Sequence, residues 1–440
     1  MKLNRYLIKG TFVGALGGLL FGFDTAVISG TTETLVPNFT LTSQQLGITV
    51  ASALAGAVIG AMSSGYPGER WGRRDSLRLM AFLYLVSSVG CAFAWNWFAL
   101  LLFRFIGGLG IGGSSVLGPM YIAELAPARM RGRLVGVFQL NIVIGVLLAY
   151  FSNYVIGTFH LGLSEWRWQL GISAIPAIGF LSMLFGIPRS PRWLVSKNRI
   201  DEARRVLELT GSHNSEAELK EIIESIHFER STEPLFQRKY SFPIFLATIT
   251  GAFNQLSGIG AVIYYLNDIF TRAGFSRNSG NLQAVAVGGT NMIFTLVGMA
   301  LIDKIGRKAL LLFGSSGLAI CLAGVAYVFW TRSHQSALVW LLMAYVGCFA
   351  LSQGIVVWVY IGEVFPTRVR AKGQSLGSSS HWIMNAIISG IFPVLATSSG
   401  AYPFIFFGTM MVVQFFLVLF IYPETKNTSL EQIEHRLKIE

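Results

Sequence analysis

Residues 241–266 read SFPIFLATITGAFNQLSGIGAVIYYL and contain no Asp, Glu, Lys or Arg. A helix of this length crosses about 30 Å of hydrocarbon, so the stretch predicts a membrane span. Eleven other windows share this character, nine of them free of charge and two carrying one charge each. They are 11–30, 46–66, 79–97, 98–120, 134–157, 168–187, 281–302, 309–330, 336–360, 373–398 and 401–422. The sequence therefore predicts an all-α membrane protein with twelve transmembrane helices.

The charged residues support this prediction and give an orientation. Of the 440 residues 53% are hydrophobic and 13% charged, and a soluble core explains one or two long apolar runs rather than a dozen. With the amino terminus inside, only four of the 34 Lys and Arg fall outside (Arg167, Arg272, Arg277 and Arg332), and Arg104 falls within a span. This asymmetry predicts a plasma (inner) membrane protein with both termini cytoplasmic. It also disfavours nucleic acid as a partner for the +12 chain, because the basic residues are spread over many short loops.

The two halves of the chain repeat each other. Residues 69–74 (ERWGRR) return at 303–308 (DKIGRK), an offset of 234 residues, and Tyr121-Ile-Ala-Glu124 returns at Tyr360-Ile-Gly-Glu363, an offset of 239. Two motifs at nearly one offset indicate a duplicated six-helix unit. We expect helix bundles over 1–187 and 241–422, a cytoplasmic helical linker over 188–240 and a cytoplasmic tail over 423–440.

The linker and the tail carry helix signals. Ser215-Glu-Ala-Glu218 is typical of a capping box and predicts a helix to about His227. Asn198 is a candidate N-cap for a preceding helix with Asp201 and Glu202 in its first turn. Ser429, followed three residues later by Gln432, predicts a short helix in the tail.

Asp24 and Arg104 are the two charges well inside the predicted spans. Each lies about seven residues from the outer end of its span, so both lie roughly 10 Å below the outer surface and can pair. A charge alone in hydrocarbon costs roughly 2.5–3.5 kcal/mol on insertion scales. The pair is either a structural link between two helices or a proton-coupling site, and we favour the proton site.

With these motifs the chain resembles the sugar porter family of the major facilitator superfamily. The resemblance rests on residues 17–30 (GGLLFGFDTAVISG), the two Gly-Arg-Arg/Lys loops, Pro188-Arg-Ser-Pro-Arg192-Trp193, Gln255-Leu-Ser-Gly-Ile259 and Pro423-Glu-Thr-Lys426. It implies a major facilitator fold with alternating access for monosaccharides or related polyols, in a protein that works as a monomer in the lipid bilayer.

The resemblance implies sugar contacts from both halves. They fall at Phe21, Gln139, Asn254, Gln255, Tyr264, Trp358, Trp382 and Asn385. Amides donate to and accept from hydroxyl groups, and an indole face packs on the C–H face of a sugar ring. Taken singly, such residues in a membrane helix are more often helix–helix contacts or interface anchors.

The chain departs from the family pattern at four positions. Gly260 stands where a second amide is usual on helix 7, and His381 stands where helix 11 usually has Asn or Gln. His381 is a candidate to bind sugar, to sense pH or to satisfy a neighbouring polar group. Ile355 replaces a proline on helix 10, and Arg189 replaces a glutamate of the inner network.

A larger set of charged residues lies in the inner loops and is expected to form the cytoplasmic gate. The alternative is a solvated basic face that only sets topology. The candidates are Glu69, Arg70, Arg73, Arg74, Glu124, Arg131, Arg133, Arg192, Asp303, Arg307, Glu363 and Arg370.

These features predict a transporter that imports a hexose or pentose with protons. The resemblance favours symport, because the family's uniporters tend to lack an acid at the position of Asp24. A sugar uniporter, a polyol or inositol transporter and a transport-inactive sugar receptor remain alternatives. No nucleophile–base pair or metal-ligand spacing is present, and the three cysteines (Cys91, Cys321 and Cys348) fall in apolar spans, so we expect neither an enzyme nor a cofactor.

Overall fold

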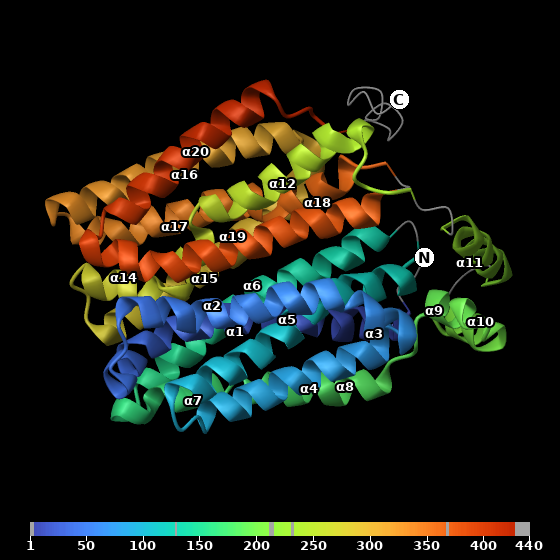
Figure 1. Cartoon of the computed structure of the whole chain (residues 1–440), viewed down its shortest axis with the longest axis horizontal. Coiled ribbons are helices and arrows are strands. Elements are labelled where there is room, and N and C mark those ends of the chain that lie inside the picture. Colours follow the sequence, from blue (N-terminus) through green and yellow to red (C-terminus); the bar gives the residue numbers. More distant parts are fainter. Residues whose placement is uncertain (1–3, 128–129, 211–214, 230–232, 367–368, 427–440) are drawn as a thin grey trace. The chain divides into compact units, whose positions relative to one another are not determined.

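The computed structural model describes residues 4–127, 130–210, 215–229, 233–366 and 369–426. Within these ranges the regular secondary structure is helical and contains no strand (Figure 1). Twelve helical segments of the described chain are long and apolar enough to cross a membrane, which confirms the predicted number.

The helical segments of the first half are α1 (Arg5–Phe39), α2 (Ser43–Ser63), α3 (Gly65–Arg70), α4 (Arg73–Ala92), α5 (Trp97–Leu125), α6 (Arg131–Gly157), the 3₁₀ turn η1 (Gly162–Ser164), α7 (Glu165–Gly171), α8 (Ala174–Met183) and the 3₁₀ turn η2 (Leu184–Gly186). Three of these helices, α1, α5 and α6, are longer than the windows that predicted them.

The linker and the second half follow in the predicted order. The linker helices are α9 (Pro191–Ser196), α10 (Ile200–Leu209) and α11 (Ser215–Glu229). The second half comprises η3 (Arg238–Tyr240), α12 (Ser241–Leu256), α13 (Ile259–Tyr264), α14 (Leu266–Arg272), α15 (Arg277–Ile305), α16 (Arg307–Thr331), α17 (Gln335–Leu351), α18 (Gln353–Glu363), α19 (Arg370–Ser398) and α20 (Tyr402–Phe420).

Packing groups the chain into two compact units, each described by itself below. Unit 1 comprises Met1–Asp24, Ala55–Val146 and Leu170–Thr232. Unit 2 comprises Thr25–Leu54, Leu147–Gln169 and Glu233–Glu440. Unit 2 thus includes the end of α1, the start of α2, the end of α6 and most of α7 together with the whole second half. The predicted boundaries between two six-helix bundles stay a prediction.

Within unit 1, glycines allow α1 and α6 to approach backbone to backbone. A Cβ atom on Gly22 would lie 1.8 Å from the carbonyl oxygen of Ile142, and one on Gly145 would lie 2.1 Å from that of Leu19. No other residue fits at these two positions, because the obstructing atoms belong to the main chain. The crossing places Phe21 and Asp24 on the same stretch of α1 as the glycine contact.

Four spans are interrupted where the sequence windows predicted continuous helices, one of them at Ser64 between α2 and α3. Gly258 has a φ of 86° and separates α12 from α13, and Ser352 separates α17 from α18 with φ −121° and ψ −90°. Residues 168–187 are divided between α7, α8 and η2. A residue in the left-handed region, such as Gly258, cannot continue an α-helix. Hydropathy alone does not reveal these interruptions, because serine and glycine are common in membrane helices.

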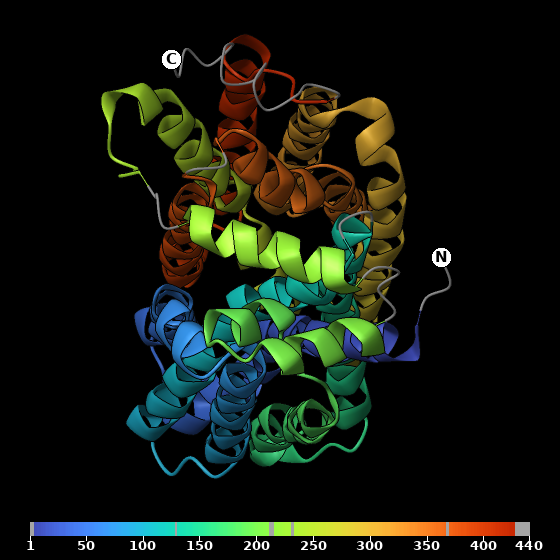
Figure 2. The same ribbon diagram turned by 90° about the vertical axis from the view of Figure 1, so that its right-hand side faces the viewer.

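The linker helices pack on one another within unit 1. Figures 1 and 2 show α9, α10 and α11 side by side, and the core they share includes Trp193, Leu194, Val206 and Leu219. The predicted helix from Ser215 is confirmed.

The prediction of Asn198 as an N-cap was wrong. Asn198 has a φ of 60° and ends α9 instead, with its N–H donated to Val195 O (2.9 Å) and that of Arg199 donated to Leu194 O (2.9 Å). These are the two hydrogen bonds of a Schellman motif, and asparagine suits it because it tolerates the left-handed region. The N-cap of α10 is Arg199. The predicted tail helix lies outside the described residues.

Candidate transport site

Asp24 and Arg104 form a partly buried ion pair within unit 1. The Nη1 atom of Arg104 lies 3.0 Å from Oδ1 of Asp24, and the Arg104 side chain is 2% exposed. The hydroxyl of Tyr84 on α4 donates to the carbonyl oxygen of Leu20 (3.2 Å), one turn before Asp24. The helices α1, α4 and α5 therefore meet around this pair. A partly buried carboxylate paired with an arginine can gain or lose a proton when its surroundings change, but its role in proton coupling stays a prediction.

Two of the predicted sugar contacts, Phe21 and Gln139, also belong to unit 1. Phe21 lies on α1 one turn before Asp24, and Gln139 lies on α6 within the region that packs on α1; both are half-buried. The other predicted sugar contacts belong to unit 2.

Within unit 2, Asn254, Gln255, His381 and Asn385 form what we call the amide cluster. All four are buried, at 3–6% exposure. The Nε2 atom of Gln255 lies 3.4 Å from Nδ1 and 3.3 Å from Nε2 of His381. Asn254 donates to the carbonyl oxygen of Gln353 (3.4 Å), in the first residue of α18. The cluster therefore connects the ends of α12 and α18 with the middle of α19.

Aromatic rings flank His381. The centroid of the half-buried Trp358 ring on α18 lies 4.9 Å from that of His381, and the Trp382 ring lies at 5.5 Å, nearly perpendicular. Tyr264 is buried on α13. The imidazole of His381 therefore lies against two indoles and beside the amide of Gln255, and its role stays a prediction.

Gly260 explains how the cluster packs. A Cβ atom at this position would lie 2.4 Å from Oδ1 of Asn385 and 2.6 Å from Oε1 of Gln255. The ends of these two amides therefore occupy the space that a side chain on α13 would need. Asn385 Oδ1 also accepts a hydrogen bond from Ser389 (3.1 Å).

Three buried polar residues that the sequence analysis missed support the cluster. Gln353 donates to Oε1 of Gln414 on α20 (2.6 Å), and both side chains are at most 1% exposed. Ser389 is fully buried. Gln353 and Gln414 could have been found as amides within apolar windows, because a buried amide needs a partner on a neighbouring helix.

The inner motifs form two ion pairs that repeat down to the atom, one in each unit. Arg73 pairs with Glu124 (3.0 Å) and donates to Gly68 O, whereas Arg307 pairs with Glu363 (2.8 Å) and donates to Ile302 O. Each glutamate also accepts from a hydroxyl: Glu124 from Ser190, and Glu363 from Thr425 (2.6 Å). Both pairs join helices of the same six-helix half. Their role in gating stays a prediction.

The remaining gate candidates are less closely connected. Arg74 contacts Asp75 (3.0 Å), Arg70 donates to the hydroxyl of Tyr66 (2.6 Å), and Arg370 donates to Phe365 O (3.3 Å). The other described candidates are Glu69 and Arg133, which are exposed, and Arg192, which is half-buried on α9. The side chains of Arg131 and Asp303 lie outside the described part of the structure.

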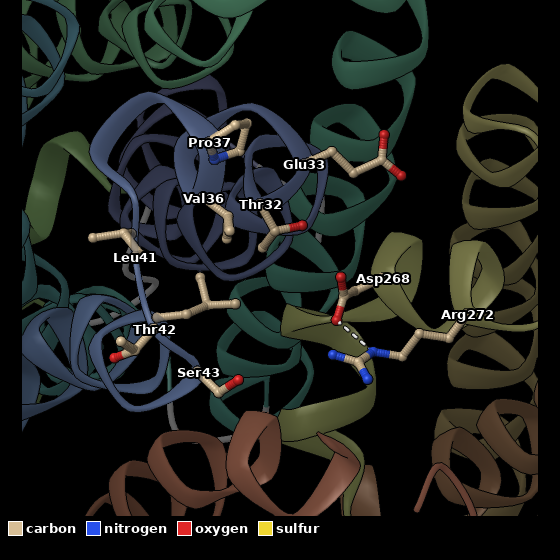
Figure 3. A pocket seen from close by; sticks show the side chains of 10 residues that line it. Thr32, Glu33, Val36, Pro37, Leu41, Thr42, Ser43, Asp268 and Arg272 are labelled. Atoms are coloured by element: carbon tan, nitrogen blue, oxygen red, sulfur yellow. Dashed lines mark hydrogen bonds and ion pairs between the residues drawn. The ribbon is translucent and has the colours of Figure 1, made fainter. Parts of the chain in front are cut away.

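A cavity of about 280 Å³ lies in unit 2 between the end of α1, the start of α2 and α14 (Figure 3). Its lining includes Glu33, Thr42 and the pair Asp268–Arg272, whose atoms lie 3.1 Å apart. It shares no residue with the amide cluster, so it does not represent the predicted sugar site.

Comparison with known proteins agrees with this geometry. The family described as "Sugar (and other) transporter" matches residues 10–437. The D-xylose–proton symporter of Escherichia coli is 35% identical and the arabinose–proton symporter of Bacillus subtilis 36% identical, each over 98% of this chain and at least 94% of the relative. The solved inward-open structure of the Escherichia coli xylose transporter XylE superposes with a TM-score of 0.87 at 34% identity, covering 98% of this chain and 100% of that chain. The chain therefore belongs to the sugar porter family of the major facilitator superfamily.

Proposed function

We propose that this protein imports a monosaccharide, a pentose or a hexose, together with protons by alternating access in the plasma membrane. The observation that carries the proposal is the partly buried pair of Asp24 and Arg104 (3.0 Å) in a sugar porter that also has a buried amide cluster beside aromatic rings. Relatives that carry xylose, arabinose or glucose support the sugar class. The proton symporters among them support the coupling.

In this mechanism the sugar hydroxyls exchange hydrogen bonds with the amides, and Trp358 or Trp382 offers an indole face to the ring. Protonation of Asp24 removes the negative charge that holds Arg104. The balance between outward-open and inward-open states then shifts by the free energy of that lost interaction. Coupling requires only that the carboxyl binds its proton more tightly in one state than in the other.

Asp24→Asn tests this proposal, because asparagine keeps the shape of a protonated carboxyl group but cannot release a proton. Right-side-out vesicles would be given a panel of radiolabelled D-xylose, L-arabinose and D-glucose, with and without an imposed pH gradient. We expect the variant to lose accumulation against a gradient while it retains sugar exchange. Asp268→Asn is the matched control, since it removes an acid that pairs with Arg272 four residues away on the same helix.

Two results would refute the coupling. Unchanged accumulation in Asp24→Asn would show that Asp24 is not the proton site, and a native protein that equilibrates sugar without accumulating it would be a uniporter. Binding without any flux in the native protein would instead indicate a receptor.

A further inference from the structure

Four basic side chains of unit 1 gather around one turn, and we call Lys9, Arg74, Arg78 and Arg189 the basic cluster. We propose that the basic cluster binds the phosphate group of an anionic phospholipid, at the membrane surface expected to face the cytoplasm.

The cluster surrounds the turn η2, which ends the sixth predicted span. Arg78 Nη2 donates to the carbonyl oxygen of Leu184 (3.1 Å), and Arg74 Nη1 donates to that of Ile187 (3.2 Å). The ammonium group of Lys9 lies 2.7 Å from the position that a Cβ atom on Gly186 would take. Cations from α1 and α4 therefore meet at consecutive residues of a single turn.

Asp75 is the one carboxylate that touches these cations in the described parts of the chain. It contacts Arg74 at 3.0 Å, Arg78 at 2.7 Å and Arg189 at 3.0 Å. Four cations around one acid leave a net charge of +3. The Nε atoms of Arg78 and Arg189 are also buried without a hydrogen-bond acceptor. An arrangement of this kind favours an external anion with several acceptor oxygens, as a phosphate group has.

The second half of the chain shows the same turn with its charge balanced. The hydroxyl of Tyr121 donates to Pro188 O (2.8 Å), as that of Tyr360 does to Pro423 O (3.3 Å), so the residue after each proline is equivalent. In the second half this residue is Glu424, whose carboxylate accepts the N–H groups of residues 307 and 308, each at 3.0 Å.

In the first half the equivalent residue is Arg189, which pairs with Asp75 (3.0 Å) instead of accepting from the first N–H groups of a helix. Replacing an acid by a base at this position changes the local charge by two units. The excess positive charge of the basic cluster, rather than the N-terminus of α4, is what favours a bound anion here.

The surroundings favour a lipid over a free anion. The guanidinium of Arg78 lies 4.2 Å from the ring centroid of Phe185, whose side chain is 66% exposed. Phe82 follows Arg78 by one turn on α4 and is 52% exposed, and Ile178 on α8 is 55% exposed. In a protein that spans a membrane, apolar side chains left exposed beside the end of a span contact acyl chains. A phospholipid offers both partners at once, a phosphate for the arginines and a chain for the exposed rings.

The test uses the full-length protein purified in a neutral detergent. Binding of short-chain phosphatidylglycerol would be measured by thermophoresis, with phosphatidylcholine and inorganic phosphate as competitors. Arg189→Glu restores the charge of the second-half turn, and we expect it to weaken phosphatidylglycerol binding about 30-fold, from roughly 1 kcal/mol for each unit of charge changed. Lys9→Gln, at an exposed position, should weaken it about fivefold by the same reasoning.

Arg205→Glu is the matched control. It makes the same change of charge at an exposed position of α10 and lies outside the basic cluster. Preserved binding in Arg205→Glu, with losses in the other two variants, would support the proposal. Equal losses in Arg189→Glu and Arg205→Glu would overturn it in favour of general electrostatic attraction. Efficient competition by inorganic phosphate would overturn the assignment to a lipid. If Arg189→Glu fails to fold, the result for Lys9→Gln decides, and native binding in that variant refutes the proposal.

Discussion

Gly260→Ala adds one methyl group where α13 faces the amide cluster, and its effect follows from two distances. The new Cβ atom would lie 2.4 Å from Asn385 Oδ1 and 2.6 Å from Gln255 Oε1, whereas ordinary contacts begin at 3.4 Å. Asn385 must therefore retreat by about 1.0 Å and Gln255 by about 0.8 Å. Both amides are held by neighbours, Asn385 by Ser389 and Gln255 by His381, so the displacement also disturbs those contacts.

The expected loss is that of two hydrogen bonds to the sugar. At roughly 0.5–1.5 kcal/mol each this amounts to about 1–3 kcal/mol, or a roughly 5- to 150-fold rise in Kd. Thermal stability should fall as well, because overpacking a buried site costs about 1–3 kcal/mol, offset in part by the preference of about 1 kcal/mol of a helix for alanine over glycine. Binding would be followed by intrinsic tryptophan fluorescence with D-xylose and D-glucose, alongside thermal unfolding in detergent.

The control and a second variant make this reasoning refutable. Gly289→Ala makes the same change on α15, where a Cβ atom would meet nothing within 4 Å, and should leave Kd unchanged. In an Asn385→Ala background, one of the two obstructing oxygens is gone, so Gly260→Ala should cost less than it does alone. A Kd within twofold of the native value in a folded Gly260→Ala protein would refute the steric account of the cluster.

Three further changes test the packing of unit 2. Gln353→Leu leaves Gln414 buried without its partner and should lower the stability of the protein by about 1–3 kcal/mol, and adding Gln414→Leu should restore most of it. A double variant as unstable as the single one would count against the pair. Gly258→Ala forces a Cβ atom into the left-handed region, at a φ of 86°, so its melting temperature should fall, by an amount equivalent to about 1–2 kcal/mol or more. An unchanged melting temperature would mean that the break between α12 and α13 is not built on this glycine. Arg277→Gln removes the cation that lies 2.6 Å from Glu165, whose side chain is 1% exposed, and should destabilise the protein by about 1–3 kcal/mol. Adding Glu165→Gln should recover most of this loss of stability. No recovery would argue against the contact.

Much of the transport machinery could be predicted because membrane proteins obey strong local rules. A span must satisfy its own backbone hydrogen bonds in hydrocarbon, so hydropathy and length predict twelve helices from the sequence. A charge in hydrocarbon needs a partner, and equal depth along two spans was enough to predict that Asp24 and Arg104 can meet. The repeated loop motifs likewise predict the equivalence that the pairs Arg73–Glu124 and Arg307–Glu363 show in the structure.

The remaining features depend on contacts between helices distant in sequence. Ser352 interrupts a helix although the window 336–360 contains no charged residue, and Gln353 and Gln414 form a hydrogen bond across 61 residues. From the sequence alone, Gly260 is only a position at which the family usually has an amide side chain.

The sequence by itself determined the spans and the charge pair within them, because both follow from the cost of placing polar groups in hydrocarbon, and it determined the duplication because the loop motifs recur at nearly one offset. The tertiary structure decided that the amides of Gln255 and Asn385 occupy the space beside Gly260. It also decided that Arg189 joins Arg74 and Arg78 around Asp75, whereas its counterpart Glu424 caps a helix. Both outcomes depend on side-chain packing between helices that are distant in sequence. No local pattern along the chain encodes the distances between those side chains.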